Sequence, residues 1–85
     1  MEFDIKQIEV FLDYIIKGLL EAPEKASLEV REDDLGILAS ITMQGDEVGK
    51  FIGKNGKTVK SIRTLLRAVG AKYNKKINLK IIEEK

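Results

Sequence analysis

The N-terminal part of the chain carries apolar residues at helical spacing. They recur every three or four positions, as on one face of an amphipathic helix, and are Ile5, Ile8, Leu12, Ile15 and Leu19. Asp4 is placed as the N-cap, Gln7 follows it by three residues, and Phe3 and Ile8 are spaced as a hydrophobic staple. Pro23 disfavours helical geometry at Ala22, so the helix is expected to end by that residue.

Apolar and polar residues then alternate in two stretches, as they do in strands with one buried face. The apolar positions are Leu28 and Val30 in the first stretch, and Ile37, Ala39, Ile41 and Met43 in the second. Turn-forming residues at 32–36 separate the two stretches and predict an antiparallel hairpin. A third alternating set near the C-terminus, Ile77, Leu79 and Ile81, predicts a third strand.

Two helices are expected between the second and third strands, over residues 46–52 and about 57–73, with Asn74 as the last C-cap. One sector of the longer helix, about 80° wide, should face the core and contains Val59, Ile62, Leu66, Val69 and Tyr73. Gly49 lies inside the shorter helix at a cost of about 1 kcal/mol relative to Ala. This glycine indicates either close packing or a groove wall that must stay low.

These elements follow the order helix, strand, strand, helix, helix, strand. Because a two-helix crossover joins the second and third strands, those two strands should be parallel. The expected fold class is therefore α+β, with a three-stranded mixed sheet and three helices packed on one face. The 85 residues fit a single domain over residues 1–85.

Charge is distributed unevenly, although the formal net charge is only +1. Residues 1–47 hold 12 acidic and 4 basic side chains, whereas residues 48–82 hold 10 basic and no acidic ones. The basic residues of the second segment are Lys50, Lys54, Lys57, Lys60, Arg63, Arg67, Lys72, Lys75, Lys76 and Lys80. Cations without acidic neighbours repel one another unless an anion is close, which favours an anionic partner over a merely solvated surface.

The turn between the last two helices has the features of a phosphate site. Residues 52–59 read Ile-Gly-Lys-Asn-Gly-Lys-Thr-Val, and Gly53 and Gly56 permit positive φ or a close backbone approach. The N-terminus of the following helix offers unpaired N–H groups and the positive end of the helix dipole, which attract anions. Lys54 and Lys57 add full charges, so the turn suits a phosphodiester.

This stretch resembles the signature of KH domains, in which an apolar residue precedes a Gly-x-x-Gly turn and Ile or Val follows it. The element order is similar to the type II KH arrangement over nearly all of the chain. Size and the basic pattern Asn-Lys-Lys-Ile-Asn-Leu at residues 74–79 are most similar to the KhpA family of small bacterial single-KH RNA-binding proteins. The resemblance implies that the turn clamps the backbone of about four nucleotides of single-stranded RNA.

On this resemblance, the RNA-binding residues are expected to be Ile52, Gly53, Lys54, Asn55, Gly56, Lys57, Val59, Lys60 and Arg63. Backbone amides at 53–57 and the two lysines would hold phosphates, and Lys60 and Arg63 would extend the basic track. Ile52, Val59 and Ile41 would floor a groove for bases, although Ile52 and Val59 are explained equally well as core residues.

The turn contains no aromatic residue for base stacking, so one KH unit should bind RNA weakly. By analogy with the family, affinity would come from a homodimer or from a larger KH-containing RNA-binding protein. The helix flank with Leu65 and Ala68, and Ala71 further round, is the expected contact surface unless the first helix covers Leu65. A module for protein assembly, with incidental contact to nucleic acid, is the alternative function.

Other functions find little support in the sequence. Gly56-Lys57-Thr58 ends a Walker A motif, but Phe51 stands where that motif needs its first glycine. There is no His or Cys, and no spacing resembles a metal site, so no catalytic residue, cofactor or metal is expected. No apolar run is long enough for a membrane span and no signal peptide is recognisable, so the expected location is the cytoplasm.

Overall fold

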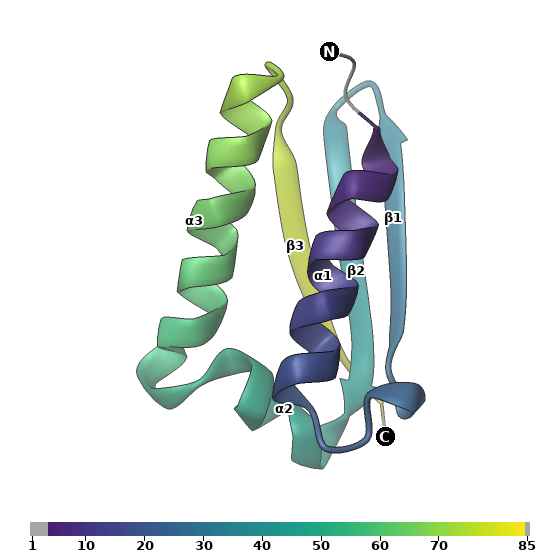
Figure 1. Ribbon diagram of the computed structural model, residues 1–85, viewed down its shortest axis with the longest axis vertical. Coiled ribbons are helices and arrows are strands. Elements are labelled where there is room, and N and C mark those ends of the chain that lie inside the picture. Colours follow the sequence, from purple (N-terminus) through teal and green to yellow (C-terminus); the bar gives the residue numbers. More distant parts are fainter. Residues whose placement is uncertain (1–3, 85) are drawn as a thin grey trace.

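The computed structural model describes residues 4–84, which form a three-stranded sheet with three α-helices on one face (Figure 1). The elements in chain order are α1 (Ile5–Leu19), β1 (Ser27–Asp33), β2 (Gly36–Gln44), α2 (Gly45–Ile52), α3 (Lys57–Lys72) and β3 (Ile77–Glu84), with short 3₁₀ turns at Pro23–Lys25 and Lys54–Gly56. The predicted α+β class and element order are confirmed, and both match a type II KH fold. Within the described range, no helix has the length and apolar character needed to cross a membrane.

The sheet has the order β1-β2-β3, so the longest strand is central. β1 and β2 pair in antiparallel fashion from Ser27↔Thr42 to Asp33↔Gly36, and β2 and β3 pair in parallel from Ile37↔Ile77 onward. The predicted hairpin and the predicted parallel pair are therefore both confirmed. Because β2 and β3 run in the same direction, their C-terminal ends lie beside α2, and the α3–β3 loop lies at the other end of the molecule (Figure 1).

The core lies between the sheet and the helices. Every second residue of β2 points into this core. The buried members of the core are Ile8, Leu12, Ile16, Leu20, Ile37, Ala39, Ile41, Met43, Phe51, Val59, Ile62, Leu66, Ile77 and Leu79. Of the five residues predicted to form the core face of α3, Val69 and Tyr73 are only half-buried. Val69 lies in the last turn of α3 and Tyr73 is its C-cap, where the chain leaves the helix for the α3–β3 loop (Figure 1).

Both ends of α1 agree with the prediction. The Asp4 carboxylate accepts a hydrogen bond from the Lys6 N–H at 2.9 Å, so Asp4 is the N-cap. Phe3, the proposed partner in a hydrophobic staple, lies outside the described residues. The helix ends at Leu19, before Ala22 as predicted, because Leu20 is extended at φ −90° and ψ 148°.

Candidate nucleic-acid interface

The Gly-x-x-Gly turn reverses the chain between α2 and α3 through three residues with positive φ. Gly53 has φ 80°, Asn55 has φ 57° and Gly56 has φ 73°. At Gly53 an added Cβ would collide with the side chain of Thr58, so no other residue fits this backbone. Asn tolerates left-handed geometry better than most residues, which explains its place before Gly56.

Hydrogen bonds inside the turn determine which amides remain as donors. The N–H groups of Gly53, Gly56 and Lys57 donate to the carbonyls of residues 49, 53 and 54 respectively. Among the bonds between described residues, these leave the N–H groups of Lys54 and Asn55 within the turn, and no side chain caps the start of α3 after Lys57. Of the donors predicted at residues 53–57, the N–H groups of Lys54 and Asn55 are thus the ones that hydrogen bonds within the turn leave available.

Gly49, one helical turn before Gly53, has open space where a Cβ would project. The close packing that the sequence left open as an explanation is therefore absent at this position. α2 presents bare backbone to its surroundings beside the Gly-x-x-Gly turn. This arrangement suits the close approach of another backbone.

Lys54, Lys57 and Lys60, in and after the turn, are exposed and form no ion pair with another described residue. Ion pairs between described residues engage only Lys50 and Lys75 of the ten basic residues in 48–82. The Arg63 guanidinium donates to the carbonyl oxygen of Leu79 at 3.3 Å, which places this flank of α3 against β3. We call the flank that carries Lys60, Arg63 and Arg67 the basic flank.

The residues predicted to floor an apolar groove differ in exposure. Ile41 has no exposed surface, because its side chain points from the central strand into the core, so its assignment to the groove was wrong. Val59 is 7% exposed and belongs to the core as well. Ile52, at the end of α2, is half-buried and therefore has apolar surface beside the turn.

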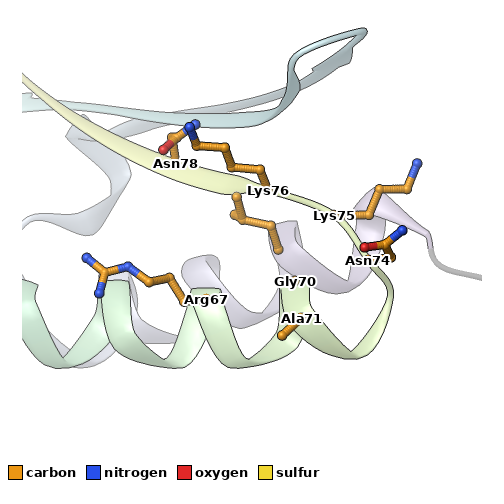
Figure 2. A pocket seen from close by; sticks show the side chains of 8 residues that line it. Arg67, Gly70, Ala71, Asn74, Lys75, Lys76 and Asn78 are labelled. Atoms are coloured by element: carbon orange, nitrogen blue, oxygen red, sulfur yellow. The ribbon is translucent and has the colours of Figure 1, made fainter.

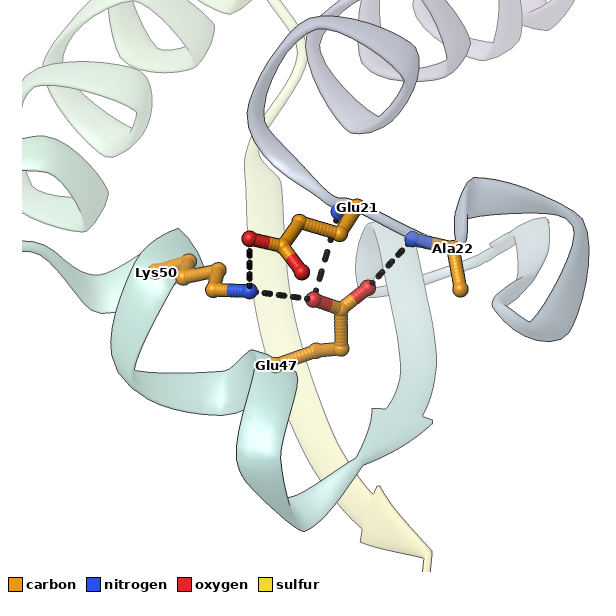
Figure 3. Close-up of polar contacts among 4 residues, drawn as sticks. All are labelled: Glu21, Ala22, Glu47 and Lys50. Atoms are coloured by element: carbon orange, nitrogen blue, oxygen red, sulfur yellow. Dashed lines mark hydrogen bonds and ion pairs between the residues drawn. The ribbon is translucent and has the colours of Figure 1, made fainter.

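A buried carboxylate fixes α2 to the end of α1 (Figure 3). Glu47 is 4% exposed, and its two oxygens accept hydrogen bonds from the N–H groups of Glu21 at 3.2 Å and Ala22 at 3.0 Å. Lys50 lies between the carboxylates of Glu47 and Glu21, at 3.2 and 3.1 Å. The end of α1 at Leu19 agrees with this contact, since the N–H groups of Glu21 and Ala22 donate to Glu47 instead of to carbonyls of the helix.

The Glu47 contact also changes the acidity of both charged partners. The Ala22 amide, together with the Glu21 amide and Lys50, lowers the pKa of Glu47 against the opposing effect of burial. The Glu21 carboxylate, together with Glu47, raises the pKa of Lys50. No sequence motif pointed to Glu47, although its position four residues before the buried Phe51 places it on the core face of α2.

The opposite flank of α3 forms an apolar hollow of about 440 Å³ with α1. Its lining includes Tyr14, Ile15, Gly18, Leu19, Ile62 and Leu65. Leu65 is 52% exposed, so α1 does not cover it. Ala71, in contrast, lies on the other side of the helix beside Arg67 (Figure 2). We call the flank with Leu65 the apolar flank.

Comparison with known proteins gives a consistent result. The model of the family "KhpA/KhpB, KH domain" matches residues 9–81. The "RNA-binding protein KhpA" of Chlamydia trachomatis is 41% identical over 75 residues, which cover 88% of this chain and 96% of that protein. Proteins of the same name from Listeria monocytogenes and Borreliella burgdorferi are 41% identical over 69 residues (81% of this chain, 91% of that protein) and 32% identical over 72 residues (85% and 88%). No solved structure matches the chain.

Proposed function

The chain belongs to the KhpA/KhpB family of KH domains, and from this premise we propose that it binds single-stranded RNA through the Gly-x-x-Gly turn. The relatives are bacterial proteins named for RNA binding, and the family is non-catalytic. The observation that carries the proposal is the turn itself. It combines three positive-φ residues, unpaired amides and two exposed lysines within five positions, 53–57.

Phosphates would be held by the N–H groups of Lys54, Asn55 and the first turn of α3, with the lysine ammonium groups beside them. The RNA backbone would pass over Gly49, where no side chain stands in its path. Bases would rest against Ile52, the proposed groove residue that is only half-buried, and Lys60 and Arg63 would extend the basic track.

One such unit offers few contacts, so we propose that a second KH unit supplies avidity. The apolar flank of α3 is the surface available for it, in a homodimer or with a larger KH-containing protein. This surface also favours the second candidate function, a module for protein assembly. A cytoplasmic, RNA chaperone-like regulator is the cellular role that fits weak, general binding of RNA.

Reversing charge at the turn tests the proposal. In the double variant Lys54→Asp, Asn55→Asp we expect RNA binding to fall at least about 100-fold, because one lysine charge is lost and two carboxylates then repel the phosphates at the turn. Asp tolerates left-handed backbone as Asn does, so the fold should persist. Fluorescence anisotropy with a labelled unstructured RNA gives the affinity, and circular dichroism checks the fold.

The matched control is Lys6→Asp, Gln7→Asp, which makes the same change of charge at an exposed Lys-amide pair on α1. This control should bind RNA nearly as wild type does. Equal affinity of the well-folded turn variant and wild type would remove the turn from the site.

A further inference from the structure

A second hollow lies at the end of α3 that is far from the Gly-x-x-Gly turn. It has a volume of about 470 Å³ and lies between the C-terminal part of α3 and the start of β3 (Figure 2). Its polar lining consists of Arg67, Asn74, Lys75, Lys76 and Asn78. At 1.5 Å per residue, Arg67 lies about 16 Å beyond Gly56 along the helix axis.

The loop that carries this lining has a fixed backbone. The Lys75 N–H donates to the Gly70 carbonyl at 2.7 Å and the Asn74 N–H to the Ala71 carbonyl at 3.3 Å, with Asn74 at φ 57°. This is a Schellman motif, which satisfies the last carbonyls of the helix. A Cβ on Gly70 would collide with the Lys75 carbonyl oxygen, so the glycine lets the loop pack closely against α3. The side chains that follow therefore project from a defined position.

The charge of the hollow is positive and largely uncompensated. Lys75 pairs with Glu32 of β1 at 2.7 Å, whereas Arg67 and Lys76 take part in none of the ion pairs between residues 4 and 84. The C-terminus of a helix is the negative end of its dipole and repels anions. Attraction for an anion must therefore come from the full charges of Arg67 and Lys76.

We propose that this hollow is a second phosphate-binding site, which takes a phosphodiester of the same RNA strand that the Gly-x-x-Gly turn holds. The inference rests on the proposed function and extends the bound RNA beyond four nucleotides. The basic flank connects the two sites, since Lys60, Arg63 and Arg67 follow one another at helical spacing on one side of α3. The amides of Asn74 and Asn78 offer donors and acceptors to ribose or base edges.

The distance between the two sites makes the proposal dependent on RNA length. At about 3.4 Å per stacked nucleotide, about five nucleotides span the 16 Å from the turn to Arg67. A tetranucleotide at the turn does not reach the hollow, whereas a 12-nucleotide strand does. A protein segment in the hollow would give no such dependence.

The experiment is an NMR titration of the full chain with a four-nucleotide and a 12-nucleotide oligoadenosine, whose bases stack. In wild type, the amide signals of residues 53–58 should shift with both RNAs, and those of residues 74–78 only with the longer one. The variant Arg67→Ala, Lys76→Ala should lose about tenfold in affinity for the longer RNA at 150 mM salt and nothing for the shorter one. Its slope of log K against log salt should shrink by about 1.4, as expected for two lost phosphate contacts on a single strand.

The control variant Lys6→Ala, Lys25→Ala removes the same charge from exposed positions that do not line the hollow. It should retain the affinity of wild type for both RNAs. An equal loss on both RNAs in Arg67→Ala, Lys76→Ala, or no loss on either, would overturn the second site alone, including the case in which a protein segment occupies it. Failure of wild type to bind either RNA would overturn the proposed function and this inference together.

Discussion

The two flanks of α3 differ in chemistry although they belong to one helix of 16 residues. The basic flank faces β3 and carries Lys60, Arg63 and Arg67, without an acidic partner among the described residues. The apolar flank faces α1 and leaves Leu65 half exposed above a hollow lined mainly by carbon. Because the flanks point in different directions, a ligand on one leaves the other accessible.

The difference between the flanks shows how a domain of this size can carry two surfaces. The core needs only the third side of α3, the row with Val59, Ile62 and Leu66. Each remaining flank is free to bind a different partner, and the two kinds of binding respond differently to salt. Phosphate contacts weaken with salt, whereas burial of apolar surface does not.

The largest effect expected for the wild-type chain is therefore the response of RNA binding to salt. For three or four phosphate contacts, the slope of log K against log salt on single strands is about −2 to −3. Raising salt from 50 to 200 mM should then weaken binding about 16- to 64-fold. Fluorescence anisotropy at four salt concentrations measures this slope. A slope near zero would mean that the basic flank is only solvated surface.

A second effect compares the RNA-binding side of the molecule with the apolar hollow, through one helix glycine at each. Gly49 on α2 and Gly18 on α1 both have open space at the Cβ position. Replacing either by Ala should stabilise the helix by up to about 1 kcal/mol, measured by urea unfolding. Gly49→Ala should also weaken RNA binding severalfold, because a methyl group then separates the RNA backbone from α2. Gly18→Ala lies in the apolar hollow and is the matched control, with unchanged affinity for a tetranucleotide.

The sequence predicted the order and faces of the elements better than it predicted how deeply each residue is buried. Periodicity placed the elements, because the pattern of Ile37, Ala39, Ile41 and Met43 has one burial solution, in which this set faces the helices. The same pattern misled the assignment of Ile41, since periodicity gives the face of a strand and not its depth below the surface. Burial at the central strand depends on elements on both sides, which local sequence does not show.

Contacts between distant segments were also beyond the sequence. Glu47 binds amides 25 and 26 residues away, and an acidic residue in the first turn of a helix is ordinarily a solvated one. At the far end of α3, the Schellman turn brings Lys76 to the hollow that Arg67 also lines. The glycines and lysines of the turn, in contrast, are local signals, so the candidate site was visible from residues 52–59 alone.

A third effect concerns the Glu47 contact, which holds α2 against the chain at the end of α1. Glu47→Gln should lower the urea midpoint of unfolding at pH 7. The side-chain NH₂ group of Gln is a hydrogen-bond donor, and it would face the backbone N–H groups or the Lys50 ammonium, which are donors as well. Because the folded state lowers the pKa of Glu47, its stabilising contribution is present above the ordinary value and is lost as the pH falls through the lowered one. The difference in urea midpoint between wild type and Glu47→Gln should therefore shrink as the pH falls below the ordinary carboxyl pKa, and disappear once the pH lies below the lowered pKa of Glu47. A difference that stays constant from pH 7 to pH 3 would show that Glu47 acts only through packing.

The smallest expected effect on RNA binding comes from the apolar flank, and it concerns self-association. Leu65 is 52% exposed, so a charge at this position faces water in the monomer and is compatible with folding. In a dimer through the α1–α3 hollow, the same charge would be buried without a partner, at a cost of several kcal/mol. Leu65→Glu should therefore convert a dimer into a folded monomer, while Lys60, Arg63 and the turn remain as they are.

The RNA readout of Leu65→Glu depends on avidity alone. Affinity for a long RNA that reaches two protomers should fall about two- to fivefold, and affinity for a tetranucleotide should not change. Sedimentation velocity at tens of micromolar gives the oligomeric state, and Ser61→Glu on the same rim of the hollow is a second variant that alters no apolar residue. A wild-type monomer at these concentrations, or loss of tetranucleotide binding in a folded Leu65→Glu variant, would show that the two flanks do not act as separate surfaces.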